Sequence, residues 1–573
     1  MRRVLFLVVL SFACGHAGPK PVGQTGLAQT GNASKKPLPS DPIIAARELS
    51  AEAHAFLRAE GDLLWKRWTT GAGVMPATAL LDHPRLVQRE SLDQVAQAWQ
   101  ASRRPADVPA LLLLHAELGT LALAHEMAAQ TEALDRARAG LKFALPGENR
   151  PLHGERELDK LLSEEPAASK RAAIALAEAK AAQPLAQLLL ERDLAQEKAL
   201  AALGLGSWAE FASELHGLAP AALADLAERT LAATEAVAAR AVAVSAQQNL
   251  GITAERLRRA DLPRLVRPSA SDAQFPAGKT WPRVQATLAA LGISQGKLLV
   301  DAEPSPAKGA RPLALWVDPP GDVRLSLRPA GGFEEQRAVL HEGARAVGGT
   351  LTETPRWEFA QLGDGGAAEG MAQLFEELAG DPAWLREATD LRGEPLDDLV
   401  HAQATRRLLG ARRAEALVLF EIKRRQGPGT KEANAALYRG LIQRATLAVL
   451  TDEDAGRWAL EADEFLRAAT VLEGALLAAQ LEQTLNTAAP APWWHAPASA
   501  VLLRQIWAQG RSATATSAAL LAGAPALDPA ALAAAAEAQL AYAAPEAPPP
   551  TQRPDYKFMQ GDHRRRQKKR KHQ

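Results

Sequence analysis

The sequence contains one cysteine, Cys14, and three tyrosines among its 573 residues, and aromatic residues make up only 5% of it. A single cysteine excludes a disulfide within the chain and any metal site built from a cysteine cluster. The Gly-x-Ser-x-Gly turn of many serine hydrolases is absent, and so is a glycine-rich phosphate-binding loop. The chemistries that depend on these motifs therefore have no support.

Alanine, leucine, glutamate and arginine are plentiful instead. These residues are good helix formers, so the composition favours helix almost everywhere. Lys plus Arg and Asp plus Glu both number 66, which gives a formal charge of zero. We expect a mainly α protein with a large helical body, and after the apolar start of the chain we expect no stretch apolar enough to cross a membrane.

The first 13 residues have the features of an export signal. Two arginines are followed by Val4 to Phe12, an apolar core too short to cross a bilayer. Ser11-Phe12-Ala13 then precedes Cys14, which predicts a lipoprotein-type signal peptide over 1–13 and a lipid on Cys14. Leucine is usual where Ser11 stands, so cleavage of an ordinary signal after Ser-x-Ala is the competing interpretation. The first interpretation places the protein in the cell envelope, anchored to a membrane.

Residues 14–44 are rich in Gly, Pro, Ser and Lys and predict a flexible linker. Residues 545–573 predict a disordered tail, first rich in proline and then basic. Seven positive charges lie between Arg564 and Lys571, so the rest of the chain carries a formal charge of −7. The tail could bind anionic lipid or polysaccharide, at ~1 kcal/mol per charge near an anionic surface, or serve only solubility. Nucleic acid is the least favoured partner, because no aromatic residues alternate with the charges.

Between linker and tail, apolar periodicity predicts an N-terminal helical region over 45–310 and a motif-bearing helical region over 311–544. In the first helix Leu49, Phe56, Leu64 and Trp68 share one face. Further helices are expected at 87–102, 108–142, 156–182, 183–203, 219–249, 281–292, 381–389, 396–425, 430–450, 453–486 and 498–510.

One stretch, 313–327, alternates apolar and polar residues as strands do. Asp318-Pro319-Pro320-Gly321 predicts a turn in its middle, so we expect a small β-hairpin just before the motif described next. A cleft-lining strand that pairs with an extended peptide and a hairpin that only caps the body are both consistent with this pattern.

His341 and Glu342 lie on a predicted helix, and Glu369 lies on the next one. A histidine at position i+4 would share a helix face with His341 and complete a zinc-binding pair, with Glu342 as general base. That position holds Arg345, which has no lone pair to offer a metal. An ordinary buried histidine, and a first-turn glutamate that favours the helix dipole, are the alternative interpretations of His341 and Glu369.

The runs VLHEGARAVGG and PRWEFAQLGDGGAAEGMAQLFEEL resemble the thimet-oligopeptidase and oligoendopeptidase F class of zinc peptidases, and more distantly the angiotensin-converting-enzyme class. The resemblance implies two helical halves around a deep cleft and zinc as the cofactor. It implies that His341 is the first ligand, Glu342 the base and Glu369 the third ligand. Glu369 follows Arg345 by 24 positions, which is close to the interval in that family.

Arg345 argues against activity in this chain. Two unit charges 4 Å apart interact by ~4 kcal/mol at an effective dielectric of 20, so a guanidinium beside a dication is costly. We expect Arg345 to pair with Glu369 or Glu342 in place of the metal.

The tyrosines that hold the oxyanion in the resembled family are also missing, near Ser499, Ala500 and Val501. His495 is the one nearby candidate to replace them. His401, His495 and Glu353 are candidate substitute ligands, although none has motif spacing.

The sequence therefore predicts a catalytically impaired, metallopeptidase-like protein that binds a peptide or protein in its cleft, with zinc retained or lost. An active zinc endopeptidase or oligopeptidase with non-standard metal ligation is the second hypothesis. A helical envelope protein that uses its tail on anionic surfaces is the third.

Overall fold

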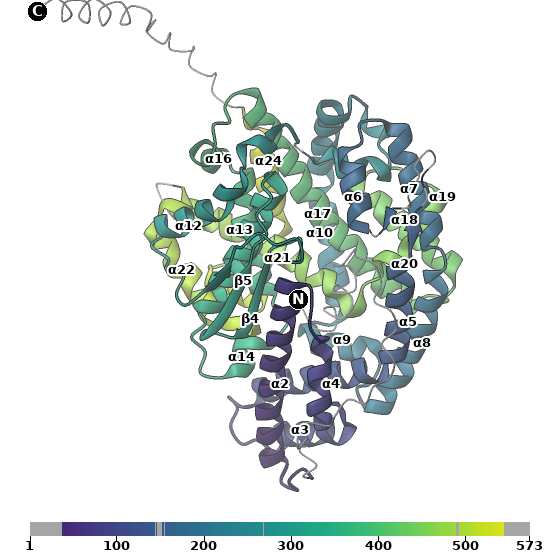
Figure 1. Cartoon of the computed structure of the whole chain (residues 1–573), viewed down its shortest axis with the longest axis vertical. Helices are drawn as coiled ribbons and strands as arrows, with labels where there is room; N and C mark the ends of the chain where they lie inside the picture. Colours follow the sequence, from purple (N-terminus) through teal and green to yellow (C-terminus); the bar gives the residue numbers. More distant parts are fainter. Residues whose placement is uncertain are drawn as a thin grey trace, which may run out of the picture.

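The computed structural model describes residues 37–143, 145, 152–153, 155–267, 269–488 and 492–543. The predicted signal peptide, Cys14, most of the linker and the basic tail lie outside the described residues. The described body is mainly α, as predicted, with helices α2 to α24 and very little sheet (Figure 1). In Figure 1 helices α5, α7 and α8 lie on one side and β4, β5 and α13 on the other, with α10 and α17 between them.

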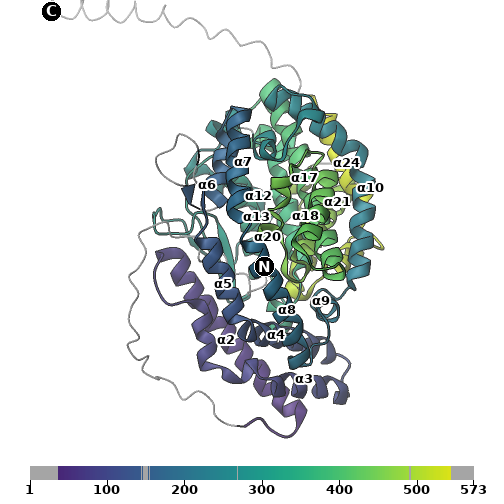
Figure 2. The same cartoon turned by 90° about the vertical axis from the view of Figure 1, so that its right-hand side faces the viewer.

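The N-terminal helices begin at Pro42, three residues before the predicted start at 45. Asp41 caps the first of them, because its Oδ1 accepts hydrogen bonds from the amides of Ile43 and Ile44 at 2.9 and 3.3 Å. The helices are α2 (Pro42–Thr70), α3 (Arg89–Ala101), α4 (Val108–Glu126), α5 (Ala128–Ala139), α6 (Glu155–Glu164), α7 (Ala168–Ala182), α8 (Leu185–Leu203), α9 (Trp208–His216), α10 (Pro220–Ser245), α11 (Leu262–Leu265) and α12 (Thr280–Ala290). Two of them, α2 and α3, pack together at one end of the molecule (Figure 2).

Two predicted helices in this region are each divided in the structure. The stretch 108–142 forms α4 and α5, which meet at Met127, and 156–182 forms α6 and α7 around Pro166. The helix α4 also corrects the expectation that no further stretch is apolar enough to cross a membrane. By length and composition this helix of 19 residues is apolar enough to cross a membrane. Half of its apolar stretch is buried in the body, where α4 contacts α3 and α8.

The predicted hairpin is present as β4 (Leu313–Asp318) and β5 (Asp322–Ser326), paired antiparallel. The sequence did not reveal its third strand, β3 (Leu299–Asp301), which pairs parallel to β5. The strand order is β3-β5-β4, so β4 lies at an edge of this sheet. A separate pair of two-residue strands, β1 (Lys142–Phe143) and β2 (Leu152–His153), was also missed. Two or three residues are too few to show alternation.

The motif helix α13 (Phe333–Thr350) packs against β4, β5 and α15 (Gly366–Glu376). On its other side α15 contacts α21 (Arg467–Ala488). Gly370 permits this close approach, since a Cβ at that position would lie 2.6 Å from Cδ2 of Leu477. Short α14 (Trp357–Gln361) lies between α13 and α15 in the chain. These contacts place the two motif helices side by side.

The centre of the molecule is built on α17 (Glu394–Gln426), which packs against α10, α18 (Lys431–Thr446), α21 and α24 (Pro529–Leu540). One hydrophobic core cluster contains residues from both predicted helical regions, for example Leu226 and Leu340. The remaining C-terminal helices are α16 (Pro382–Ala388), α22 (Pro497–Ala508) and α23 (Ala515–Leu521).

The predicted single helix over 453–486 is wrong. The chain forms the short helices α19 (Asp452–Ala455) and α20 (Trp458–Glu461) before α21 begins at Arg467. Between α20 and α21, Phe465 and Leu466 adopt left-handed backbone conformations, with φ of 49° and 57°. Residues other than glycine adopt this conformation rarely, and it breaks a helix.

Candidate functional site

A cavity of about 1660 Å³ separates N-terminal helices from the motif helices. One wall comes from α4, α5, α8 and α9, and the other from α13, α15 and α21. This cavity agrees with the deep cleft that the resemblance implies. Its motif-side lining includes His341, Glu342, Arg345 and Glu369.

The four motif residues meet as a compact group of charges. Nε2 of His341 lies 3.9 Å from Oε1 of Glu342 and 3.8 Å from Oε1 of Glu369. Nη1 of Arg345 lies 3.5 Å from Oε2 of Glu369 and 3.9 Å from Oε1 of Glu342. The predicted ion pair of Arg345 is therefore confirmed. Arg345 joins the carboxylates that the resemblance assigns to the zinc ligand and the base.

Two further residues belong to this group and were missed from the sequence. Nδ1 of His341 lies 2.8 Å from Oε2 of Glu376, and Nη2 of Arg337 lies 2.5 Å from the other oxygen of Glu376. The helical spacing of Glu376 and Arg337 relative to the motif residues could have identified both as candidates. Glu376 lies two turns after Glu369, and Arg337 lies one turn before His341, so each shares a face with a motif residue.

The neighbouring charges keep His341 protonated. Burial opposes protonation, but Glu369, Glu376 and Glu342 outweigh it and raise the pKa of His341 to about 9. Burial likewise opposes ionisation of Glu376, but Arg337 and His341 lower its pKa to about 2. For Glu369 too, His341 and Arg345 overcome burial and lower the pKa. The group thus balances His341, Arg345 and Arg337 against Glu342, Glu369 and Glu376.

Glu342 is held by the sheet as well as by Arg345. Its Oε2 accepts a hydrogen bond of 2.8 Å from the amide of Ala314 on the edge strand β4. On the same strand Nε1 of Trp316 donates to the carbonyl of Arg345 at 2.9 Å. Residues 313–316 of β4 also line a cavity of about 70 Å³ with Glu342, Arg345 and Glu369. The strand therefore contacts the motif residues, but none of its residues lines the large cavity, so the two hairpin hypotheses both remain predictions.

This donor set does not fit the zinc ion that the resemblance implies. Catalytic zinc sites have three protein ligands with lone pairs, at about 2.0–2.2 Å for nitrogen and oxygen. Here the second ligand position holds Arg345, which only donates hydrogen bonds and already lies against Glu369. His341 and Glu369 alone fall short of the required ligands, and the guanidinium places a positive charge beside them.

The candidate substitute ligands His401, His495 and Glu353 lie away from the motif residues. Nε2 of His495 lies 2.6 Å from Oε2 of Glu387, and the His495 side chain is 38% exposed. Nε2 of His401 lies 3.1 Å from the carbonyl of Tyr542. Neither histidine lines the large cavity, and neither does Glu353. Among the described residues, none of these three side chains replaces the missing ligand or the missing oxyanion donors.

No protein-family model matches this chain, and no curated protein matches it. The resemblance to zinc peptidases therefore stays a prediction that depends on the motif residues and their spacing.

Proposed function

We propose that this chain is an exported, peptidase-like lipoprotein of the cell envelope that binds a peptide or protein segment in its cleft and does not hydrolyse it. The observation that carries this proposal is the position of Arg345. Its guanidinium contacts both Glu369 and Glu342, the two carboxylates that would bind zinc and activate water in the resembled family. With both engaged, neither is available for those tasks.

The size of the cleft supports a peptide rather than a small molecule. Its volume of about 1660 Å³ exceeds the range of about 300–1,000 Å³ that is usual for small-molecule pockets. The lining combines charged side chains with apolar ones such as Leu81, which is 69% exposed. An exposed leucine at a cavity suits an apolar side chain of a ligand. The edge strand β4 offers a further surface for extended chain.

The predicted export signal and the basic sequence of the tail support the proposed location. A lipid on Cys14 would hold the body at a membrane through the linker, and the basic tail would contact anionic lipid or polysaccharide. A peptide-binding protein in that position would meet peptides and unfolded segments in the envelope.

Binding is tested with a library of short synthetic peptides incubated with the body, residues 37–543, and analysed by mass spectrometry after gel filtration. We expect retained peptides, and we expect Leu81→Asp to lower their retention at least about tenfold, because a buried charge opposes an apolar contact. Leu194→Asp is the matched control, since Leu194 is 67% exposed and does not line the cavity. Equal retention by both variants would place peptide binding outside the cleft.

Hydrolysis is tested on the retained peptides, with Glu342→Gln as the control. We expect no cleavage by the native protein above the level of that variant. Arg345→His should create a zinc site at the motif that a further His341→Gln change removes. Cleavage by the native protein that Glu342→Gln abolishes would instead identify an active peptidase with non-standard metal ligation.

A further inference from the structure

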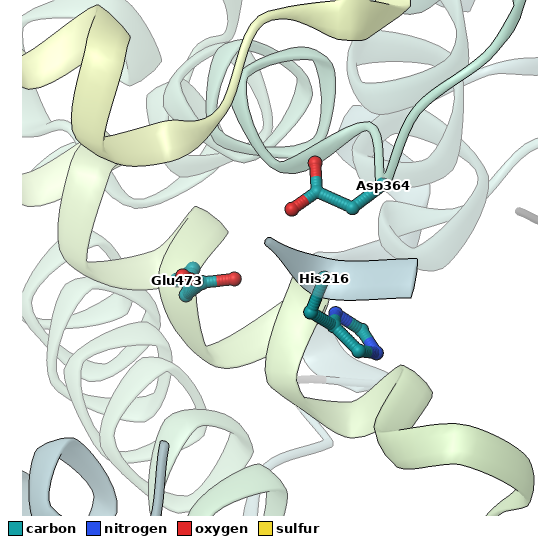
Figure 3. Close-up of side chains that lie close together, drawn as sticks. All are labelled: His216, Asp364 and Glu473. Atoms are coloured by element: carbon teal, nitrogen blue, oxygen red, sulfur yellow. The ribbon is translucent and has the colours of Figure 1, made fainter. Parts of the chain in front are cut away.

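Three potential metal ligands meet beside the motif residues, from distant parts of the chain. His216 ends α9, Asp364 lies in the turn between α14 and α15, and Glu473 lies on α21 (Figure 3). One ligand atom from each lies within 4.8 Å of the others. The three residues are 6%, 9% and 3% exposed, so the group is inside the protein.

The imidazole of His216 is oriented as in metal-binding histidines. Its Nε2 lies 2.7 Å from the carbonyl oxygen of Phe465. A carbonyl only accepts hydrogen bonds, so Nε2 carries the hydrogen and Nδ1 of the neutral ring carries the lone pair. A second-nitrogen bond to a backbone carbonyl is the usual support of a histidine ligand. The left-handed turn at Phe465, which breaks the predicted helix, supplies this carbonyl.

Glu473 provides an independent sign of a ligand. Its side chain is buried, and Oε2 has no hydrogen-bond partner within the described part of the chain. Figure 3 shows its carboxyl group directed into the space it shares with His216 and Asp364. A buried carboxyl oxygen without a partner is costly, so such groups in folded proteins usually have a hydrogen bond, a retained proton or a cation. The direction of the Glu473 carboxyl group towards His216 and Asp364 favours the cation here.

Two of the three residues border open space, which would hold water ligands of an ion. His216 and Asp364 line the large cavity, and both also line a smaller one of about 140 Å³. An ion at this site would have to compete with the guanidinium of Arg511 for Asp364. Arg511 lines the smaller cavity, and its Nη2 lies 3.5 Å from the position of a Cβ on Gly365, the neighbour of Asp364. Gly363 and Gly365, with φ of 121° and 74°, flank Asp364 and shape the turn that presents it.

We propose that His216, Asp364 and Glu473 form a binding site for one divalent metal ion of the Zn²⁺ or Mn²⁺ class, separate from the His341 motif. One imidazole nitrogen with two carboxylates suits these ions. Ligand atoms around tetrahedral zinc lie about 3.4 Å apart, so binding draws the three side chains inward by about 1 Å. Since the large cavity reaches two of the ligands, a bound ion would face the peptide cleft.

Elemental analysis and calorimetry test this site on the body, residues 37–543, freed of metal and then titrated with Zn²⁺ or Mn²⁺. We expect one ion per chain. Glu473→Gln and His216→Gln should each weaken binding at least about 100-fold, because loss of an outer partner alone costs about 10–100-fold. Glu415→Gln is the matched control, as Glu415 is also a buried glutamate without hydrogen-bond partners in the described structure. It should leave binding unchanged.

A second variant separates this site from the motif. His341→Gln should leave the ion bound, and the ion should raise the melting temperature of the native protein but not that of Glu473→Gln. Absence of binding to the native protein, equal binding by Glu473→Gln, or loss of binding in His341→Gln alone would each overturn the proposal. The peptide-binding function is judged on peptide retention and cleavage, so it stands or falls separately.

Discussion

Nη1 of Arg345 lies 3.5 Å from Oε2 of Glu369, which joins the two motif helices by an ion pair. The resemblance to zinc peptidases predicts a zinc ion between the two helices at this position. A guanidinium is larger than a metal ion and carries half its charge, yet it contacts the same carboxylates. An ion pair thus links the two helices at the position where the resemblance predicts a metal ion.

Arg345→Met should destabilise the protein. The two side chains are 14% and 16% exposed, so the change leaves Glu369 and Glu342 poorly compensated. We expect the free energy of unfolding in urea to fall by about 3 kcal/mol, the lower end of the range for a broken buried pair. Adding Glu369→Gln should restore part of that loss. Additive effects of the two changes would show that the pair is not coupled.

Gly370→Ala should disturb the contact between α15 and α21. A methyl group there would meet Leu477 at 2.6 Å, and overpacking of this kind costs about 1–3 kcal/mol. Gly410→Ala is the matched control, because Gly410 is also within a helix and has nothing within 4 Å of an added Cβ. That change should stabilise the protein by about 0.5–1 kcal/mol. Chemical denaturation of both variants measures the difference.

Glu415 should make stability fall as the pH rises. Burial raises its pKa from 4.5 to about 8 in the folded protein, and neither carboxyl oxygen has a hydrogen-bond partner in the described structure. The folded state thus holds this proton between those values while the unfolded state has lost it. The contribution of Glu415 falls by about 1.4 kcal/mol per pH unit across that interval.

The comparison with Glu415→Gln isolates this effect. The variant should be more stable than the native protein at pH 8 and no more stable at pH 4, measured by urea denaturation at each pH. A constant difference between the two proteins at all pH values would contradict the raised pKa.

Cys14→Ser should release the full-length protein from the membrane fraction of an exporting host. The lipid is predicted to be on this one cysteine, and no other cysteine could replace it. Removal of residues 564–573 is the control for attachment by the basic tail, and salt washing should reveal that contribution. Membrane retention of the serine variant at high salt would exclude the lipid anchor.

The sequence by itself determined the helical class and the local order of the motif. Alanine and leucine in long periodic stretches favour helix whatever surrounds them, and α17 and α22 begin and end close to the predicted positions. His341, Glu342 and Arg345 lie on consecutive turns of one helix, so their proximity follows from helical geometry alone. The ion pair between Arg345 and Glu369 could be predicted because a buried charge is stabilised by an opposite charge nearby.

Only the tertiary structure decided which distant groups meet. Glu376 reaches His341 because α13 and α15 pack side by side. His216, Asp364 and Glu473 meet because α9, the turn before α15 and α21 converge on one point. No periodicity spans such separations, since helix spacing relates only residues within a few turns. The break at Phe465 depends on the same packing: its ring lies against Trp208 and Phe211. Those contacts can offset a backbone strain that local preference alone would not allow.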